Sequence, residues 1–353
     1  MNSLQLAERK IGQKMPPFIV AEMSANHNQS LERALRIVEE ANRAGVDAVK
    51  IQTYPEETVT IDTDKAGFVV RDPNSPWVNR KLFDLYKEAH TPWEWHKPIM
   101  QKCRDLGLIC FSTPLDSSVV DFLESLNVPF YKIGSFEIID LPLIRRVAQT
   151  GKPMIISTGM ASCAEIDEAV TTAKKSGCKE IVLLKCTSSY PASARDANLR
   201  TIPHMSDAFG CLVGLSDHTL GIGVAVAGVA MGAAIIEKHF TLSRNDGGLD
   251  ATFSLEPDEM ARLVCECISA WEALGTVKYG STPWEGKSKA FRRSLYIVQD
   301  LKRGDILNVN NLKIIRPGYG LAPRFYDILI GKRVCRDVKK GTALTWELLF
   351  DEK

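Results

Sequence analysis

The sequence of 353 residues lacks the features that mark several classes of protein. It has no excess of either charge, because 44 Lys and Arg residues oppose 43 Asp and Glu residues, so no broad basic field is present to hold a nucleic acid or an anionic membrane. Its nine cysteines form no CxxC pair, which favours reduced thiols in the cytoplasm over a disulfide framework. The N-terminus has no apolar stretch typical of a signal peptide, and the longest uncharged run, Leu220 to Ile236, falls short of a bilayer span. We therefore expect a cytoplasmic protein that binds neither nucleic acid nor membrane.

The chain does contain a regular alternation of short β-branched runs with helical patterns. Ser30 and Gly45 bracket one such pattern as N-cap and stop signal, which predicts a helix over 30–44. Strands that each lead into a helix form a parallel sheet, and eight of them close a (β/α)₈ TIM barrel in a chain of this length. An open doubly wound sheet is the alternative. The eight predicted strands cover 18–22, 47–52, 108–112, 129–133, 154–158, 180–185, 211–216 and 233–240.

The pattern changes near residue 280, which predicts a second domain. Residues 281–292 are polar and read as a linker, and 293–353 contain short strand-like pieces separated by glycine turns. We therefore predict a barrel domain over 1–280 and a small β-rich domain over 293–353. A domain that small has little core of its own and gains stability by docking on another surface. Within the barrel, the connection over 53–91 has the length of a binding loop and carries Trp77 and Tyr86.

Polar residues gather at the carboxyl ends of the predicted strands, where barrels of this class carry their active sites. A single residue of this kind is usually a cap or a structural hydrogen bond, but that reading does not account for all eight strands together. The residues concerned are Glu22, Ser24, Asn26, His27, Lys50, Gln52, Ser112, Thr113, Lys132, Ser135, Ser157, Thr158, Lys185, Cys186, Thr187, Ser188, Ser216, Asp217, His218, Glu237, Lys238 and His239.

Lys50 and Lys132 allow three interpretations. A buried ammonium group is costly without an anion, so each could pair with Glu22 or Glu237. Either lysine could instead form a Schiff base. The third interpretation is a bound phosphate or carboxylate, which the nearby serine and threonine hydroxyls favour. A nucleoside triphosphate is not the obvious anion, because the sequence has no GxxxxGK[ST] loop.

His218 and His239 end two adjacent predicted strands, which places two imidazoles side by side on the rim. With Asp217 and Glu237 beside them they predict a divalent metal site. Two nitrogen ligands completed by water and oxygen suit Mn²⁺, with Mg²⁺ or Co²⁺ as alternatives, better than structural Zn²⁺. A general acid/base pair would need the same residues.

These residues, in this order, resemble the sialic acid synthase family over nearly the whole chain, and the small domain resembles the antifreeze-like, or SAF, module of those enzymes. Within the family the sequences at 21–30, 88–96 and 242–257 are similar to the pseudaminate branch. Ser188 departs from the neuraminate enzymes, which often place Asn there. The motifs are AExxxNH (21–27), VKxQT (49–53), FSTP (111–114), YKIGSFE (131–137), ISTGM (156–160), LLKCTSxYP (183–191), GLSDHT (214–219), EKHFT (237–241) and RPGYG (316–320).

The resemblance implies condensation of phosphoenolpyruvate with an open-chain acetamido sugar. It implies Glu22 as a catalytic carboxylate and a divalent metal on His218 and His239 that polarises the aldehyde. The implied phosphoenolpyruvate cradle consists of Lys50, Thr113, Lys132, Ser135, Ser157, Ser188 and Ser216. The implied sugar contacts are Glu22, Gln52, Tyr190, Asp250 and Arg316.

The resemblance also implies a domain-swapped homodimer in which the small domain of one chain caps the barrel of its partner. Two rival functions remain open from the residues alone. One is a class I aldolase with Lys132 or Lys185 as the Schiff base, and the other is a carbohydrate-binding protein without an enzymatic activity.

Overall fold

A computed structural model describes residues 3–73 and 75–350. The chain divides into two compact units, Met1–Gly275 and Thr276–Lys353, which are described separately. The predicted barrel domain begins at residue 1 and the predicted small domain ends at residue 353, and both of these end residues lie outside the described residues.

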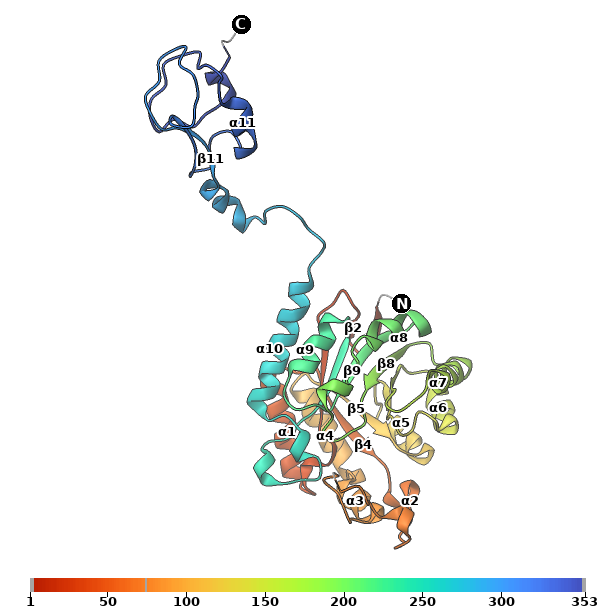
Figure 1. Cartoon of the computed structure of the whole chain (residues 1–353). Coiled ribbons are helices and arrows are strands. Elements are labelled where there is room, and N and C mark those ends of the chain that lie inside the picture. The colour runs from red at the N-terminus through yellow and green to blue at the C-terminus, as the bar shows by residue number, and fades with distance from the viewer. Residues whose placement is uncertain (1–2, 74, 351–353) are drawn as a thin grey trace. The chain divides into compact units, whose positions relative to one another are not determined.

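The first unit is a closed barrel of eight parallel strands (Figure 1). Strand β10 pairs with β3, from Ile235 opposite Phe18 to His239 opposite Glu22, and this pairing closes the sheet. The predicted (β/α)₈ barrel is therefore confirmed, and the open doubly wound sheet is excluded. The strands are β3 (Phe18–Glu22), β4 (Ala48–Thr53), β5 (Ile109–Pro114), β6 (Tyr131–Ile133), β7 (Met154–Ser157), β8 (Ile181–Cys186), β9 (Leu212–Asp217) and β10 (Ile235–His239).

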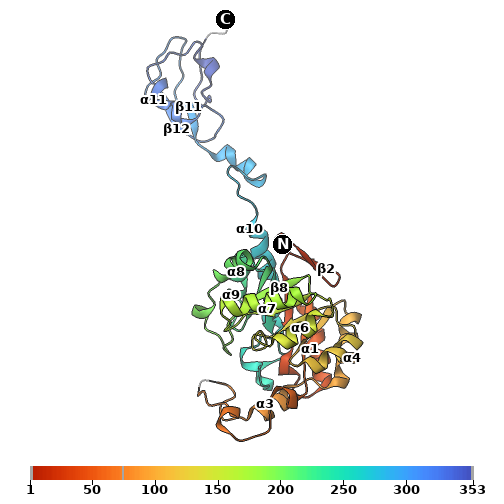
Figure 2. The ribbon, with the colours of Figure 1, turned by 90° about the vertical axis from the view of Figure 1, so that its right-hand side faces the viewer.

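Helices surround the barrel, as Figures 1 and 2 show from two sides. The Ser30 side chain accepts a hydrogen bond from Arg33 N at the start of α1, and Gly45 ends that helix at φ 82°, a left-handed conformation that suits glycine. The principal helices are α1 (Leu31–Ala44), α4 (Trp93–Asp105), α5 (Val120–Ser125), α6 (Leu141–Ala148), α7 (Cys163–Lys175), α8 (Thr201–Phe209), α9 (Gly223–Ala230) and α10 (Pro257–Leu274).

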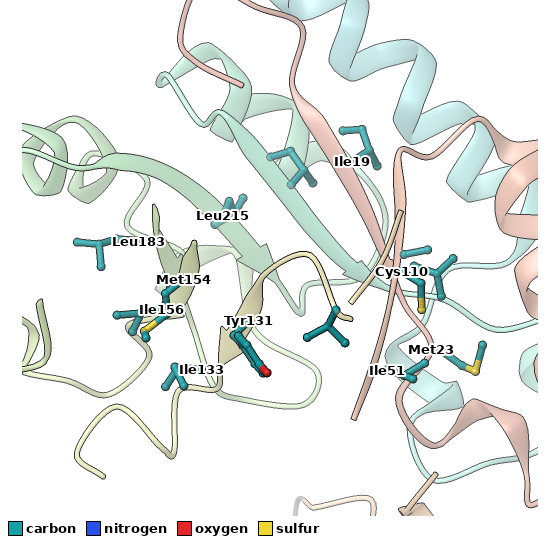
Figure 3. Close-up of a cluster of buried hydrophobic side chains, with 14 of the residues drawn as sticks. Ile19, Met23, Ile51, Cys110, Tyr131, Ile133, Met154, Ile156, Leu183 and Leu215 are labelled. Atoms are coloured by element: carbon teal, nitrogen blue, oxygen red, sulfur yellow. The ribbon is translucent and has the colours of Figure 1, made fainter. Parts of the chain in front are cut away.

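The strand residues alternate between two buried apolar clusters, because successive side chains of a strand point to opposite faces. One cluster lies between the strands and the helices, and Figure 3 shows part of it, including Ile19, Ile51, Tyr131 and Leu215. The other fills the barrel interior and includes the following strand residues: Phe18, Val20, Ala48, Phe111, Ile155, Val182, Leu184, Leu212 and Ile235.

An N-terminal hairpin that was not predicted completes the interior cluster. Its strands are β1 (Leu4–Leu6) and β2 (Arg9–Ile11). Leu4, Leu6 and Ile11 pack with the interior residues that begin the strands, so the hairpin closes the amino end of the barrel. At the opposite end of the barrel, the carboxyl ends of the strands carry polar side chains.

The long connection after β4 contains α2 (Glu56–Val59), the 3₁₀ turn η2 (Ala66–Phe68) and α3 (Leu82–Ala89). The second unit contains η7 (Trp284–Phe291), the antiparallel pair β11 (Ser294–Ile297) and β12 (Leu312–Ile315), and α11 (Tyr326–Leu329). Its own core includes Leu295, Leu312 and Leu344. Across the described residues, no helix is both long and apolar enough to cross a membrane.

Candidate functional site

The site is a polar layer on top of the apolar barrel interior. Because side-chain direction repeats every two residues, the residue two positions beyond an inward apolar residue also faces the interior. In β3, for example, Val20 is part of the interior cluster and Glu22 is the next inward residue. The same spacing gives the polar layer in the other strands: Lys50, Thr113, Lys132, Ser157, Cys186 and Glu237, with Ser216 four residues beyond Leu212.

Two lysines and two carboxylates form a buried cluster in this layer. Lys50 Nζ lies 2.8 Å from Glu22 Oε2, 3.5 Å from Glu237 Oε1 and 3.2 Å from Thr113 Oγ1. Lys132 Nζ lies 4.0 Å from Glu237 Oε1 and donates to Ser157 Oγ at 2.7 Å. The ion pairs considered from the sequence are therefore present, and they hold both ammonium groups at the carboxyl end of the barrel.

Burial and neighbouring charge set the protonation of this cluster. Burial raises the pKa of Glu22, because it outweighs the lowering effect of Lys50. Burial alone would lower the pKa of Lys50, but Glu22 and Glu237 outweigh it and the pKa is raised. Burial also lowers the pKa of Lys132 in spite of Glu237. The pKa of Glu237 is lowered because both lysines outweigh its burial. Glu22 is thus the carboxyl group of this cluster best suited to carry a proton.

Hydroxyl groups converge beside the lysines at the backbone of Gly159. A Cβ atom at this glycine would lie 2.2 Å from Ser188 Oγ and 2.8 Å from Ser135 Oγ, and the Gly159 amide donates to Ser135 Oγ at 3.1 Å. On the other side, Ser216 Oγ donates to Glu237 Oε1 at 3.1 Å. Together with Thr113 and Ser157, the structure thus brings hydroxyls from five barrel strands or the loops after them to this layer.

The two predicted imidazoles are adjacent, with the ring centroids of His218 and His239 5.2 Å apart. His218 Nδ1 lies 3.0 Å from Thr187 O. His239 Nδ1 is buried, has no hydrogen-bond partner among the described residues, and lies 3.8 Å from Asp250 Oδ2. Burial, followed by the nearby His218, holds the pKa of His239 well below its usual value, so this ring is neutral and able to bind a metal.

One neighbour expected at the imidazoles is not there. Asp217 faces the helices, where its carboxylate lies 2.7 Å from the buried Lys238 Nζ. In the described part of the chain, no group of three or more His, Cys, Asp and Glu side chains is arranged to hold a metal ion. The unpartnered nitrogen of His239 beside His218 still fits a divalent ion with two protein nitrogens, whose other ligands would be water and substrate oxygens.

A hydrogen-bonded chain runs from Glu22 to Asp250. Gln52 Nε2 donates to Glu22 Oε1 at 3.1 Å and to Ser24 Oγ at 3.0 Å, and Ser24 Oγ donates to Asp250 Oδ2. Tyr190 lies at the same end, with its ring centroid 4.5 Å from that of His218. The predicted sugar contacts of the barrel therefore lie together.

Three residues of the site were given no role in the sequence analysis. Ser24 links Gln52 to Asp250 as described above. The Cys186 thiol lies 3.8 Å from His218 Nδ1, and its pKa is lowered to about 7 because His218 and nearby hydroxyls outweigh burial. The Glu137 carboxylate lies against Gly134, because a Cβ atom at Gly134 would be 2.2 Å from Glu137 Oε2. Burial raises the pKa of Glu137. The two-residue period of β8 could have identified Cys186, whereas Ser24 and Glu137 lie beyond strand ends and follow no such period.

Two further candidates lie elsewhere. Lys185 follows the outward-facing Leu183 by two residues, and its Nζ donates to Cys186 O at 2.8 Å, so it is not part of the inward polar layer. Arg316 belongs to the second unit, where its side chain is exposed and has no hydrogen bond or ion pair with any described residue.

Comparisons with known proteins agree with this architecture. The NeuB family profile matches residues 37–279, and the SAF domain profile matches residues 292–349. The chain is 41% identical to the pseudaminic acid synthase of Campylobacter jejuni, over 93% of this chain and 95% of that one. It is 37% identical to the N,N'-diacetyllegionaminic acid synthase of Legionella pneumophila, over 95% of each chain. The crystal structure of N-acetylneuraminic acid synthetase from Leptospira borgpetersenii superimposes with a TM-score of 0.71 at 33% identity, covering 81% of this chain and 94% of that one.

Proposed function

Because the chain belongs to the NeuB family, we propose that it is a pseudaminic acid synthase. The reaction joins phosphoenolpyruvate to 2,4-diacetamido-2,4,6-trideoxy-altrose in its open-chain form. C3 of phosphoenolpyruvate attacks the aldehyde carbon, water adds to C2, and the C2–O bond to phosphate breaks. The identity of 41% to a pseudaminic acid synthase, against 37% to a legionaminic one, supports this sugar. A legionaminate or N-acetylneuraminate synthase is the alternative.

The observation that carries the proposal is the buried polar layer, in which cations, hydroxyls and a carboxyl group of raised pKa lie together. Lys50 and Lys132, 2.8 Å and 4.0 Å from their carboxylates, offer the charge that phosphate and carboxylate groups require. Thr113, Ser135, Ser157, Ser188 and Ser216 offer hydrogen bonds to the same anion. A barrel interior built for packing alone would carry branched apolar residues at these positions.

Glu22 is proposed to move a proton at the sugar or at the attacking water. Its raised pKa lets it hold a proton closer to neutral pH than an ordinary carboxyl group would, and Gln52 fixes the orientation of one of its oxygens. Gln52, Tyr190 and Asp250 are proposed to bind the sugar. His218 and His239 are proposed to hold a divalent ion, Mn²⁺ first and Mg²⁺ or Co²⁺ as alternatives. Such an ion, when bound, acts as a Lewis acid toward the aldehyde oxygen.

A domain-swapped homodimer, in which Arg316 of one chain reaches the sugar in the barrel of its partner, is also part of the proposal. The charge distribution supports docking of the two kinds of unit. Residues 276–353 contain 16 Lys and Arg against 8 Asp and Glu, whereas residues 1–275 contain 28 against 35. Opposite net charges favour association of the small unit with a barrel surface.

The test is phosphate release from phosphoenolpyruvate with the pseudaminate, legionaminate and neuraminate precursors in turn, followed by the mass of each product. The pseudaminate precursor should give the highest kcat/KM. With ¹⁸O in the bridging position of phosphoenolpyruvate, C–O cleavage sends the label into phosphate. Label retained in the organic product would refute the proposed bond cleavage. An adduct trapped by borohydride with a keto substrate would favour the aldolase instead.

A further inference from the structure

The long connection after β4 reaches the site through one aromatic side chain. The ring of Trp77 lies 5.8 Å from that of Tyr190 and 6.3 Å from that of Phe253. Tyr190 in turn lies 4.5 Å from His218, and Phe253 lies 5.0 Å from His239. The three aromatic rings, called here the aromatic wall, are therefore continuous with the two imidazoles.

A hydrogen bond fixes the orientation of the Trp77 indole ring. Its indole Nε1 donates to Leu249 O at 2.9 Å, and Leu249 directly precedes Asp250, whose carboxylate lies 3.8 Å from His239 Nδ1. Because the donor is already used, the ring has no polar group left for a ligand. It offers carbon surface, in contrast to the hydroxyl groups and charges on the phosphoenolpyruvate side of the barrel.

Trp77 lies where the far end of a sugar would reach if its aldehyde group were bound at the imidazoles. The ring lies one layer beyond Tyr190 and Phe253 as seen from the imidazoles, where the aldehyde carbon would react. An open chain of six carbons with bonds of about 1.5 Å extends roughly 6 Å from C1 to C6, enough to pass the first layer of rings. The trideoxy sugar ends in a methyl group, which a carbon surface accepts, whereas a C6 hydroxyl there would lose its hydrogen bonds to water.

We propose that Trp77 is a specificity-determining residue that selects sugars ending in a C6 methyl group. This inference rests on the proposed synthase function. A hydroxyl buried without a partner costs affinity by about 5- to 150-fold, the equivalent of roughly 1–3 kcal/mol. The wild-type enzyme should therefore prefer the trideoxy sugar over its 6-hydroxy counterpart by a factor in that range.

The experiment measures kcat/KM for this pair of sugars, which differ by one oxygen, in four proteins. Trp77→Phe keeps the carbon surface and loses the bond to Leu249, so it should keep the preference. Trp77→Gln should reduce the preference at least about 5-fold while leaving KM for phosphoenolpyruvate unchanged. Ile61→Gln is the matched control, because Ile61 is 59% exposed in the same connection, and it should behave as wild type.

The outcomes separate the two proposals. If both Trp77 variants lose activity toward both sugars equally, Trp77 only positions the connection and the inference is overturned. If Ile61→Gln also reduces the preference for the trideoxy sugar, the effect is not specific to Trp77, and the inference is overturned. If the wild-type enzyme releases phosphate but does not discriminate between the sugars, the inference fails while the synthase function stands. No phosphate release with any acetamido sugar would overturn the function itself.

Discussion

The two lysines of the buried cluster should differ sharply in their effect on stability when each is replaced by methionine. Lys50 compensates two carboxylates, at 2.8 Å from Glu22 and 3.5 Å from Glu237. Lys132 is paired with Glu237 at 4.0 Å, and its other contacts are Ser157 Oγ and a backbone carbonyl. Methionine has a similar length and no charge, so each substitution removes mainly the ammonium group.

The magnitudes follow from what each substitution leaves behind. Lys50→Met leaves Glu22 buried with Gln52 as its hydrogen-bond donor, and breaking a buried ion pair in this way costs about 3–5 kcal/mol. Lys132→Met leaves Glu237 with Lys50 and Ser216, and removes an ammonium group whose pKa burial already lowers. Its cost should be smaller, about 1 kcal/mol, because it strands only hydrogen-bond acceptors, the Ile133 carbonyl and Ser157 Oγ. Both variants should nevertheless bind phosphoenolpyruvate about 10- to 150-fold more weakly, because each loses a charge-assisted hydrogen bond.

The loss of stability in Lys50→Met should also depend on pH, because it depends on the charge of Glu22. The pKa of Glu22 is already raised, and Lys50 is an influence that lowers it, so Lys50→Met should raise it further. A carboxyl group whose folded-state pKa exceeds its unfolded value takes up a proton in the folded state first. Its penalty is therefore complete above the folded pKa and fades as the pH falls from the folded pKa toward the unfolded value. The stability gap between wild type and Lys50→Met should therefore narrow as the pH falls through the raised folded-state pKa of Glu22.

Urea unfolding followed by circular dichroism measures these free energies, and calorimetric titration measures phosphoenolpyruvate affinity. The double variant Lys50→Met/Glu22→Gln should recover much of the loss in stability, because the stranded carboxylate becomes a neutral amide. If Lys132→Met is the more destabilising change, or if the double variant is no more stable than Lys50→Met, the assignment of the ion pairs is wrong.

Four further predictions concern other parts of the molecule. His239→Ala should abolish Mn²⁺ binding in a titration and lose turnover while keeping phosphoenolpyruvate affinity, and full activity of chelator-stripped wild-type enzyme would contradict the metal site. Arg316→Ala should lower the affinity for the acetamido sugar and leave the affinity for phosphoenolpyruvate unchanged. When Arg316→Ala chains are refolded together with Glu22→Ala chains, a swapped heterodimer has one barrel with both defects and one with neither, so part of the activity should return. Heterodimers that form without any recovery of activity would refute the exchange of domains. Leu6→Ala should cost about 2–5 kcal/mol in urea unfolding, because this fully buried side chain closes the amino end of the barrel, and a loss below about 1 kcal/mol would show that the hairpin is dispensable. Burial lowers the pKa of His96 to about 4 from 6.5, so the folded state resists protonation and loses stability as the pH falls between those values; His96→Gln should flatten this part of the stability profile, and an unchanged slope would contradict it.

The barrel could be predicted from the sequence because its signals are local. Each β-branched run leads into a helical pattern, and caps such as Ser30 and Gly45 mark the ends of the elements. The hairpin over 4–11 escaped prediction because its strands have three residues each, too few for a periodic pattern. Its role depends on apolar contacts with residues far along the chain, which no local pattern encodes.

The polar side chains were predicted to gather at the carboxyl ends of the barrel strands, where the structure places them, but the direction of individual side chains was incompletely predicted. Proximity to a strand end placed Asp217 at the imidazoles, whereas the two-residue period turns it outward to Lys238. The same period turns Cys186 inward, beside His218. Residues in loops, such as Glu137, follow neither signal, because their orientation depends on the close approach of separate segments.

The two-residue period also explains how one barrel holds a packed core and a polar site without a separate domain for each. Along β4, Ala48 belongs to the interior core and Lys50, the next inward residue, belongs to the buried ion cluster. The change from core to site therefore takes a single inward step, and Lys50 is fixed in position by the packing below it. Enlarging Ala48 to valine should consequently disturb the geometry of Lys50 as well as the core. We expect a fall in phosphoenolpyruvate affinity out of proportion to the loss in stability, because a charge-assisted contact tolerates little displacement. Calorimetric titration beside urea unfolding would measure both, and the outward-facing substitution Val49→Ala, on the same strand, is the control that should affect stability alone.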